Sequence, residues 1–367
     1  MSDVAEPRAR ATPGRAPGRP AAKTGTTVPV SVVMPVRNEE RNLSESVSHV
    51  LAQEYPGEFE IVLAVGPSKD RTEEIAKRLA AGDSRITVVA NPSGQIPSAL
   101  NAAVRAARHP VIVRVDARSR LPAKYIATAV RTLRETGAVN VGGVRAAHGV
   151  TPFQRAVAWA MTSPAGVGSS RYNTGGSAGP CDSVYLGAFR REAIEGVGGY
   201  DEKYLRAEDW EMNHRIRAAG GLIWFQPELR VTYRPRGSVR AVGSQYFLYG
   251  RWRRVIARRH GTINVRYLTP AVVLLALAAG TLAGIAGMAG LAVNAGGWSP
   301  WLLSAGMLIP LAYVVGVLVV TAKAGTDGRL TRPALAWLPV VLVTMHLCWG
   351  AGFLTSSRRL GGPGRGP

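Results

Sequence analysis

Cysteine is almost absent from this sequence: its 367 residues include two, Cys181 and Cys348. Two cysteines so far apart form neither a disulfide framework nor the paired spacing of a structural zinc site. Acidic residues are also scarce, with 24 against 45 Lys and Arg, so the formal net charge is +21. This balance predicts anionic partners, among them nucleic acid, phosphorylated substrates and an anionic membrane face. For the soluble part of the chain, a reducing compartment is the simplest interpretation.

Two nucleotide-binding motifs are missing as well. No G-x-G-x-x-G follows the first predicted strand, and no G-x-x-x-x-G-K-[ST] occurs in the chain. These absences exclude the Rossmann dinucleotide fingerprint and the P-loop. A bound nucleotide would therefore be held by acidic side chains and a metal ion.

Charge nearly disappears after residue 267. Three apolar segments follow, at Leu268–Val293, Pro300–Ala322 and Pro333–Leu354. Each exceeds the roughly 20 residues that cross a bilayer, and three in succession favour membrane spans over buried core helices. We therefore predict three transmembrane helices within residues 267–356, in a multi-pass protein of the cell membrane.

Basic residues predict the orientation of these spans. Arginines crowd the segment before the first span, and Lys323, Arg329 and Arg332 lie between the second and third. Such residues stay on the cytoplasmic side, so we expect the N-terminal domain to be cytoplasmic. Three spans then place the C-terminus outside with Arg358, Arg359 and Arg365, which breaks this rule mildly. A re-entrant third segment is the alternative, and three spans are our prediction.

The remaining chain divides by composition. Residues 1–28 are rich in Pro, Ala, Arg and Gly without periodicity, and they lack the apolar core of a signal peptide. They predict a disordered basic tail, as does the short segment 357–367. Residues 244–266 mix aromatic and basic side chains, which is typical of an amphipathic helix at a membrane surface. Residues 29–243 are left as the main folded domain.

Strands and helices alternate in the first half of this domain. β-Branched apolar runs predict buried strands, and segments with helical spacing separate them. The pattern predicts an α/β fold with a doubly wound, mostly parallel sheet. Strands are expected at 28–36, 59–66, 86–91 and 111–116, helices at 38–53, 70–82, 96–108 and 207–221, and a mobile Gly- and Ser-rich loop at 163–180.

Polar clusters follow three of the predicted strands. In an open α/β sheet, ligands bind at the carboxyl ends of the strands, so these clusters should converge on one edge. Strand ends are often polar in any case, but three clusters that each hold an acid favour a site. Asp116 lies among arginines, which suggests a metal ion and a phosphate. The clusters are Pro35, Arg37, Asn38 and Glu39; Ser68 and Asp70; and Asp116 with Arg118.

At these positions the sequence resembles a known family. The segments "VSVVMPVRNEERNL", "ALNAAVRAA", "VRVDAR" and "EDWEMNHRIRAAGG", with the S-x-D turn at Ser68, resemble the family 2 inverting glycosyltransferases of the GT-A fold. The resemblance covers about residues 29–260. The long segment from Cys181 to Gly221 and the tail motif "HLCWGAGFL" are similar to succinoglycan-type exopolysaccharide glycosyltransferases with C-terminal membrane spans.

The resemblance implies roles for individual residues. The Pro35–Glu39 loop, Ser68 and Asp70 would border the nucleotide, and Asp116 would hold a divalent metal, Mg or Mn, against the diphosphate. Asp209 stands at the position of the catalytic base, although an acid in the first turn of a helix also suits the helix dipole. The residues implied on the acceptor or diphosphate side are Asp182, Glu208, Arg251 and Trp252, with a turn role as the alternative for Asp182.

The sequence also departs from the family pattern. The D-x-D motif is "DAR" here, so the second metal ligand is missing or lies elsewhere. The usual "DDGSTD" turn is "VGPSKD", and the Gln of the membrane-proximal motif is Leu248. Mg²⁺ commonly takes only one or two protein carboxylates together with phosphate oxygens, so a single aspartate can serve.

These observations predict a membrane-bound inverting glycosyltransferase of exopolysaccharide or cell-envelope biosynthesis. It would move a sugar, one per event, from a nucleotide-sugar donor to a lipid-linked or glycan acceptor. One alternative is a polyprenyl-phosphate sugar synthase, whose phosphate acceptor has little need of a base. Another is a non-catalytic membrane protein that binds a nucleotide sugar or glycan. Nucleic acid is not expected as a partner, because no recognition module accompanies the basic residues.

Overall fold

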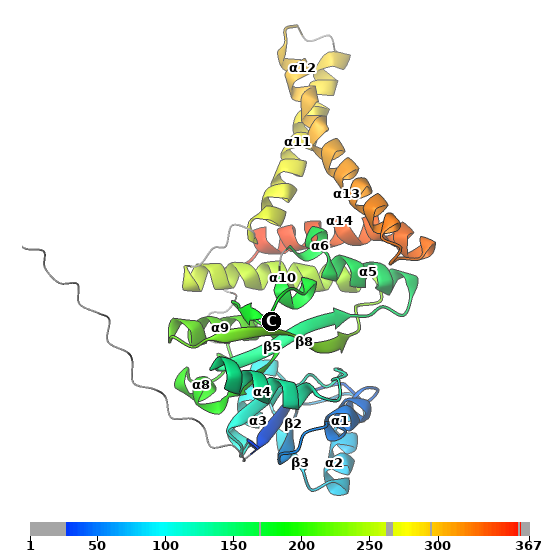
Figure 1. Cartoon of the computed structure of the whole chain (residues 1–367). Coiled ribbons are helices and arrows are strands. Elements are labelled where there is room, and N and C mark those ends of the chain that lie inside the picture. Colours follow the sequence, from blue (N-terminus) through cyan, green and yellow to red (C-terminus); the bar gives the residue numbers. More distant parts are fainter. Residues whose placement is uncertain (1–26, 169, 262–266, 294–295, 359, 361–367) are drawn as a thin grey trace, which may run out of the picture.

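The computed structural model describes residues 27–168, 170–261, 267–293, 296–358 and 360. Nearly all of the predicted N-terminal tail, residues 262–266 and most of the predicted C-terminal tail lie outside this range. The remaining chain forms an α/β domain, joined by a long helix to three apolar helical segments (Figure 1).

The first half of the domain alternates strictly between strands and helices. The strands β1 to β4 are parallel, as the alternation predicts, with β1 between β2 and β4. Apolar side chains on both faces bury β1 and β2 almost completely. The elements are β1 (Val30–Val36), α1 (Leu43–Leu51), β2 (Phe59–Val65), α2 (Thr72–Gly82), β3 (Ile86–Ala90), α3 (Ile96–Ala106) and β4 (Val111–Arg114).

The second half makes the sheet mixed. The sheet has eight strands in the order β3-β2-β1-β4-β7-β5-β8-β6, and β7 runs antiparallel to both of its neighbours. Strand β5 is parallel to β8, whereas the short β6 is antiparallel to it. The elements are α4 (Tyr125–Thr136), β5 (Asn140–Ala147), α5 (Pro152–Thr162), β6 (Gly179–Pro180), β7 (Tyr185–Arg190), α8 (Arg191–Gly196), α9 (Glu208–Ala218) and β8 (Ile223–Tyr233).

Helices cover both faces of the sheet, as in other doubly wound folds. One apolar core joins the sheet to α1, α2 and α4, through side chains such as Leu43, Ile75 and Ile126. A second core joins the opposite face to α3, α8 and α9, through Leu100, Ile194 and Ile216.

The predicted loop at 163–180 contains two helical turns, which the sequence reading missed. These are α6 (Pro164–Val167) and α7 (Arg171–Thr174). Ser163 begins α6 by accepting a hydrogen bond from the backbone N–H of Ala165, and Pro164 occupies the first helical position. Both features favour a helix start, so the glycines separate short helices here.

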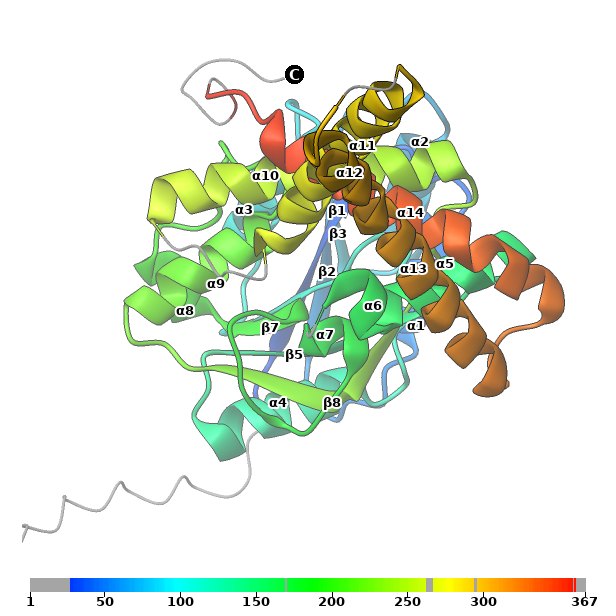
Figure 2. The ribbon, with the colours of Figure 1, turned by 90° about the horizontal axis from the view of Figure 1, so that it is seen from above.

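The C-terminal part consists almost entirely of helices. Three segments are long and apolar enough to cross a membrane: Thr269–Ala292, Ser299–Thr326 and Arg332–Leu354. Helices α11 and α13 extend away from the domain and meet at α12, while α14 lies beside α10 (Figures 1 and 2). The elements are α10 (Val239–His260), α11 (Thr269–Ala292), α12 (Ser299–Ser304), a 3-10 turn (Ala305–Met307), α13 (Leu308–Thr326) and α14 (Arg332–Leu354).

Candidate active site

The candidate site lies where the order of the parallel strands changes direction. From β1 the chain adds β2 and β3 on one side and then β4 on the other. The loops after β1 and β4 therefore diverge at the carboxyl end of the sheet, where α/β folds bind their ligands. Arg37, Asn38 and Glu39 follow β1, and Asp116 follows β4, so the predicted convergence of these clusters is observed.

Hydrogen bonds join the loops after β1, β2 and β3. The Arg37 side chain donates to the backbone oxygens of Pro67 at 3.2 Å and Gly94 at 3.1 Å. The backbone N–H of Asn38 donates to Ser68 Oγ at 3.1 Å, and Asn38 Oδ1 accepts from the backbone of Lys69 at 2.8 Å. Asn38 has a φ of 53°, a left-handed conformation that asparagine tolerates better than most residues. The predicted nucleotide loop is thus one connected unit.

The acids of this unit mainly stabilise its shape. Thr72 Oγ1 donates to Asp70 Oδ1 at 2.5 Å, and this hydrogen bond is the main cause of the lowered pKa of Asp70. Thr72 Oγ1 in turn accepts from the backbone of Glu39 at 2.7 Å. Arg118 forms an ion pair with Glu39 at 2.7 Å, and its side chain is 46% exposed. Arg118 therefore lies at the predicted site with a carboxylate partner already in place.

Arg114 at the end of β4 is the centre of the acidic cluster. Its side chain is buried and forms ion pairs with Asp116 Oδ1 at 3.3 Å, with Glu208 Oε1 at 3.2 Å and with Asp209. Burial alone would lower the pKa of Arg114, but the three carboxylates, Asp209 foremost, raise it well above its usual value. The guanidinium of Arg114 thus contacts both the predicted metal ligand, Asp116, and the predicted base, Asp209.

The carboxyl group of Asp209, the predicted base, has a perturbed pKa. Its burial raises the pKa of the carboxyl group to about 7, although Arg114 acts in the opposite direction. One third of the side chain is nevertheless exposed to solvent. A base whose pKa lies near the working pH is the most effective in proton transfer.

The start of α9 orients these acids. Glu208 and Asp209 occupy the first turn of α9, where the positive end of the helix dipole favours carboxylates. The preceding residue, Ala207, has a φ of 60°, which is uncommon for a side chain other than glycine. The chain therefore enters α9 through a strained turn that directs both acids toward Arg114.

The donor set fits a metal ion held by one carboxylate. Among the described residues, no group of three or more His, Cys, Asp or Glu side chains is arranged to hold a metal ion. Asp116 remains one third exposed, and its one contact with Arg114 is long, at 3.3 Å. Mg²⁺ or Mn²⁺ with diphosphate oxygens needs few protein ligands, so Asp116 suits that role without a second aspartate.

The acceptor-side residues are separated in space. Trp252 is buried against Tyr204, with ring centroids 6.3 Å apart, and Arg251 lies over the Phe247 ring at 5.8 Å. Asp182 is exposed and pairs with Arg217 at 3.2 Å. Arg217 is in the last turn of α9, about 12 Å along the helix axis from Asp209 at 1.5 Å per residue, so Asp182 pairs with a residue at the other end of that helix. The roles of these residues stay predictions.

Sequence reasoning missed Arg145 on β5. Its guanidinium carbon lies 5.2 Å from the ring centre of Tyr233 and 5.9 Å from those of Tyr172 and Tyr185. One nitrogen donates to Asn173 Oδ1 at 2.6 Å, whereas the buried Nε has no hydrogen-bond partner among the described residues. No ion pair of Arg145 with a carboxylate occurs in that part of the chain. The signal in the sequence was an arginine within an otherwise buried strand, "NVGGVRAA".

Comparison with known proteins identifies the class of this domain. Residues 31–198 match the model of the family described as glycosyl transferase family 2. Succinoglycan biosynthesis protein ExoA of Rhizobium meliloti (strain 1021) is 30% identical over 88% of this chain and 93% of its own length. The chain therefore belongs to glycosyl transferase family 2.

Two more distant proteins share most of their length with the chain. A dolichyl N-acetyl-alpha-D-glucosaminyl phosphate 3-beta-D-2,3-diacetamido-2,3-dideoxy-beta-D-glucuronosyltransferase of Methanococcus voltae is 22% identical over 88% of this chain and 95% of its own. The mannosyltransferase PcManGT from Pyrobaculum calidifontis, solved with GDP-Man and Mn²⁺, is 20% identical with a TM-score of 0.53, covering 89% of this chain and 86% of its own. This structural likeness confirms the predicted GT-A fold.

Proposed function

We propose that this protein is a membrane-attached inverting glycosyltransferase of exopolysaccharide or cell-envelope biosynthesis. It transfers a hexosyl group from a nucleotide-sugar donor to a lipid-linked or glycan acceptor. The observation that carries this proposal is the cluster in which Arg114 joins Asp116 to Asp209 at the carboxyl end of the sheet. The relationship to a succinoglycan biosynthesis protein supports the biosynthetic role.

In the proposed reaction, Asp209 accepts the proton of the acceptor hydroxyl as its oxygen attacks the anomeric carbon. The bond from that carbon to the nucleoside diphosphate breaks in the same displacement, so the configuration inverts. A divalent metal held by Asp116, when bound, neutralises charge on the departing diphosphate. Arg114 keeps Asp209 oriented and lowers the pKa that burial has raised.

The membrane environment is part of the proposal. Helix α10 carries Arg251, Arg253, Arg254, Arg258 and Arg259, and it leads into the apolar helices. Arginines beside a membrane segment favour the cytoplasmic face, where anionic lipids attract them. We therefore place the catalytic domain in the cytoplasm, with α10 at the membrane surface and the acceptor supplied from the bilayer.

One observation favours a second candidate, the polyprenyl-phosphate sugar synthase. Arg145 is buried without a carboxylate partner among the described residues, and a buried charge is costly unless it is paired. Tyr185 lies near both Arg145 and the acidic cluster. Its ring centre is 5.9 Å from the guanidinium carbon of Arg145. Burial raises the pKa of Tyr185, and the nearby charge of Asp116 raises it further. Burial raises the pKa of Tyr246 on α10, and the nearby charge of Arg145 acts in the opposite direction. A phosphate on a lipid acceptor would supply the missing anion at this position.

The two candidates are separated by a transfer assay with the full-length protein in detergent. A panel of UDP-, GDP- and dTDP-sugars is tested with Mg²⁺ or Mn²⁺ against a polyprenyl phosphate and a polyprenyl-diphosphate-linked sugar. Transfer to the linked sugar supports the first function, and transfer to the free phosphate supports the second. Nucleotide-sugar binding without transfer to any acceptor would support the non-catalytic alternative.

Arg145→Gln distinguishes a phosphate contact from a structural one. If Arg145 contacts the acceptor phosphate, the variant raises the KM of the acceptor and leaves the KM of the donor unchanged. A purely structural role would lower thermal stability and affect both constants. Arg131→Gln, at an exposed pair with Glu228, is the matched control.

A further inference from the structure

The third apolar helix, α14, lies against the catalytic domain and α10 along its whole length. Near its start, Trp337 contacts Phe153 of α5, with ring centroids 5.4 Å apart. At its middle, a ring nitrogen of His346 lies 2.7 Å from the backbone oxygen of Ala165 in α6. Beyond its end, Arg258 of α10 donates to the backbone oxygen of Ser357 at 2.8 Å. A helix of 23 residues is about 34 Å long, so these contacts extend over its full length.

Close backbone packing accompanies these contacts. Gly250 of α10 leaves no room for a side chain, because a Cβ atom there would overlap the carbonyl oxygen of Trp349. Gly352 of α14 is in the same position against the carbonyl oxygen of Phe247. Two glycines, one from each helix, thus allow α10 and α14 to approach closely over several turns. The C-terminal half of α14 cannot separate from α10 without losing this interface.

Helix α10 itself cannot cross a bilayer. Its last three turns hold five arginines, and a charged side chain at the bilayer centre costs several kcal/mol. A helix that packs along α10, α5 and α6 must lie at the same depth as they do. Helix α14 is apolar on all its sides, as a membrane span is, and one of these sides is buried on the protein, so its position is decided by its packing and not by its composition.

The other two apolar helices are arranged differently. Helices α11 and α13 extend away from α10 and meet at α12, farthest from the domain (Figure 1). Large apolar side chains such as Leu282, Ile285 and Leu318 are more than half exposed on them. Their outer surfaces therefore suit a lipid environment.

We propose that α11 and α13 cross the bilayer as a hairpin, while α14 lies along the membrane surface and returns the C-terminus to the side of the catalytic domain. This inference rests on the proposed membrane attachment. It replaces three crossings by two, and it removes the mild conflict between the C-terminal arginines and the charge rule for membrane loops.

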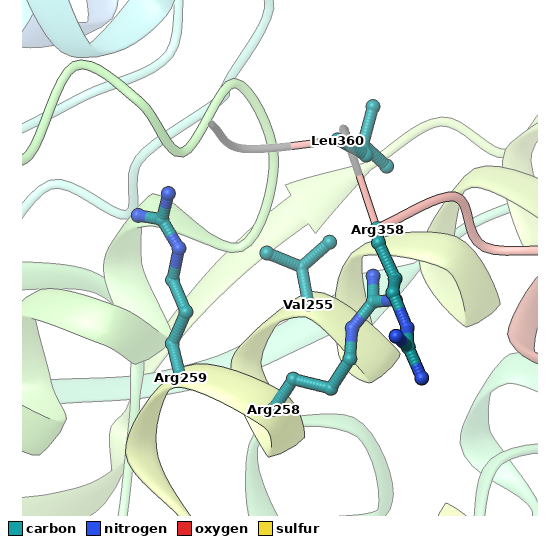
Figure 3. Close-up of a pocket in the computed structure, with 5 residues that line it drawn as sticks. All are labelled: Val255, Arg258, Arg259, Arg358 and Leu360. Carbon is teal, nitrogen blue, oxygen red and sulfur yellow. The ribbon is translucent and has the colours of Figure 1, made fainter. Parts of the chain in front are cut away.

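The end of α14 supports the position at the lipid headgroups. Arg258 and Arg259 of α10 and Arg358 line a small cavity of about 180 Å³, together with Val255 and Leu360 (Figure 3). Burial and the neighbouring charges of Arg254 and Arg358 lower the pKa of Arg258. An anionic neighbour would stabilise these like charges, and lipid phosphates provide such a neighbour at the membrane surface.

Cysteine labelling tests the arrangement in the full-length chain. Cys181 and Cys348 are first replaced by serine and alanine, and single cysteines are then introduced by Ser84→Cys in the domain, Ser299→Cys at α12 and Thr355→Cys after α14. All three positions are exposed. Intact cells are treated with a membrane-impermeant maleimide before and after permeabilisation. The proposal expects Ser84→Cys and Thr355→Cys to be labelled only after permeabilisation. Ser299→Cys is expected to be labelled in intact cells.

Three crossings would give a different pattern, because Thr355→Cys would then label together with Ser299→Cys, and this overturns the proposal. A reporter fused after Pro367 gives the same comparison without a substitution near α14. If the protein is found in the soluble fraction, the proposed membrane attachment fails as well, and this result is distinct from the three-crossing pattern.

Discussion

Replacing Asp209 by asparagine tests the proposed chemistry most directly. The substitution keeps the shape of the side chain and an oxygen atom that Arg114 can contact, but it removes the proton acceptor. Loss of a general base typically lowers the rate 10²- to 10⁴-fold, which is about 3 to 5 kcal/mol in the activation barrier. Arg114 keeps Asp116 and Glu208 as partners, so the fold should survive the change.

The pH dependence adds a second signature. Burial raises the pKa of Asp209 to about 7, so the carboxylate is the base above that pH and the protonated acid is inactive below it. At one pH unit below the pKa, roughly a tenth of the groups are ionised, so kcat/KM should be about tenfold lower than on the alkaline plateau. The residual activity of Asp209→Asn should lack this dependence.

The assay follows release of the nucleoside diphosphate in the presence of donor and acceptor, at a series of pH values. Glu195→Gln on α8, whose side chain is mostly exposed, serves as a control of the same charge change. If Asp209→Asn retains activity within tenfold of the original protein, or keeps the same pH profile, Asp209 is not the base. That result would also favour a phosphate acceptor, which needs no proton removal.

Three further substitutions test the site and its supports. Asp116→Asn should abolish the metal-dependent part of nucleotide-sugar binding in isothermal titration, and equal binding with and without the change would argue against the metal role. Gly250→Ala should lower the melting temperature in detergent, since overpacking costs about 1–3 kcal/mol, whereas Gly316→Ala, with open space around it, should not. Burial raises the pKa of Glu60, but hydrogen bonds, Arg108 among their donors, lower it below its ordinary value. The ionised Glu60 therefore stabilises the fold above about pH 4.5, and this contribution is lost as the pH falls through the lowered pKa. Glu60→Gln should therefore reduce stability at pH 7 more than at acid pH, and an equal effect at both would refute the reasoning.

Much of the fold follows from local patterns. The strands β1, β2 and β4 are buried on both faces, and the helices between the first four strands have one apolar side, so the order and parallel arrangement of these strands could be predicted. The convergence of Arg37, Asn38 and Asp116 followed from the same topology, because the carboxyl ends of parallel strands share an edge. The resemblance of "EDWEMNHRIRAAGG" to the family added Asp209, which no periodicity could single out.

The parts that could not be predicted depend on contacts between distant segments. Strand β7 enters the sheet antiparallel between β4 and β5, although it lies about 70 residues after β4. In the sequence, Arg114 is one of several arginines near Asp116. Its ion pairs with Glu208 and Asp209 depend on how α9 packs against β4, so its contact with three carboxylates could not be predicted. Likewise, the hydropathy of α14 is that of a membrane span, and its packing against α10 is not encoded in its own composition.

The strained turn before α9 has a consequence for protein engineering. A left-handed conformation costs an alanine roughly 1–2 kcal/mol, and Ala207→Gly would relieve this strain in the folded state. The same replacement would widen the range of directions from which the chain enters α9. Glu208 and Asp209 would then sample orientations away from Arg114, and under the proposed function a variant selected for heat resistance at this position would have a lower transfer rate. A search for sturdier versions of this protein should therefore leave residue 207 unchanged.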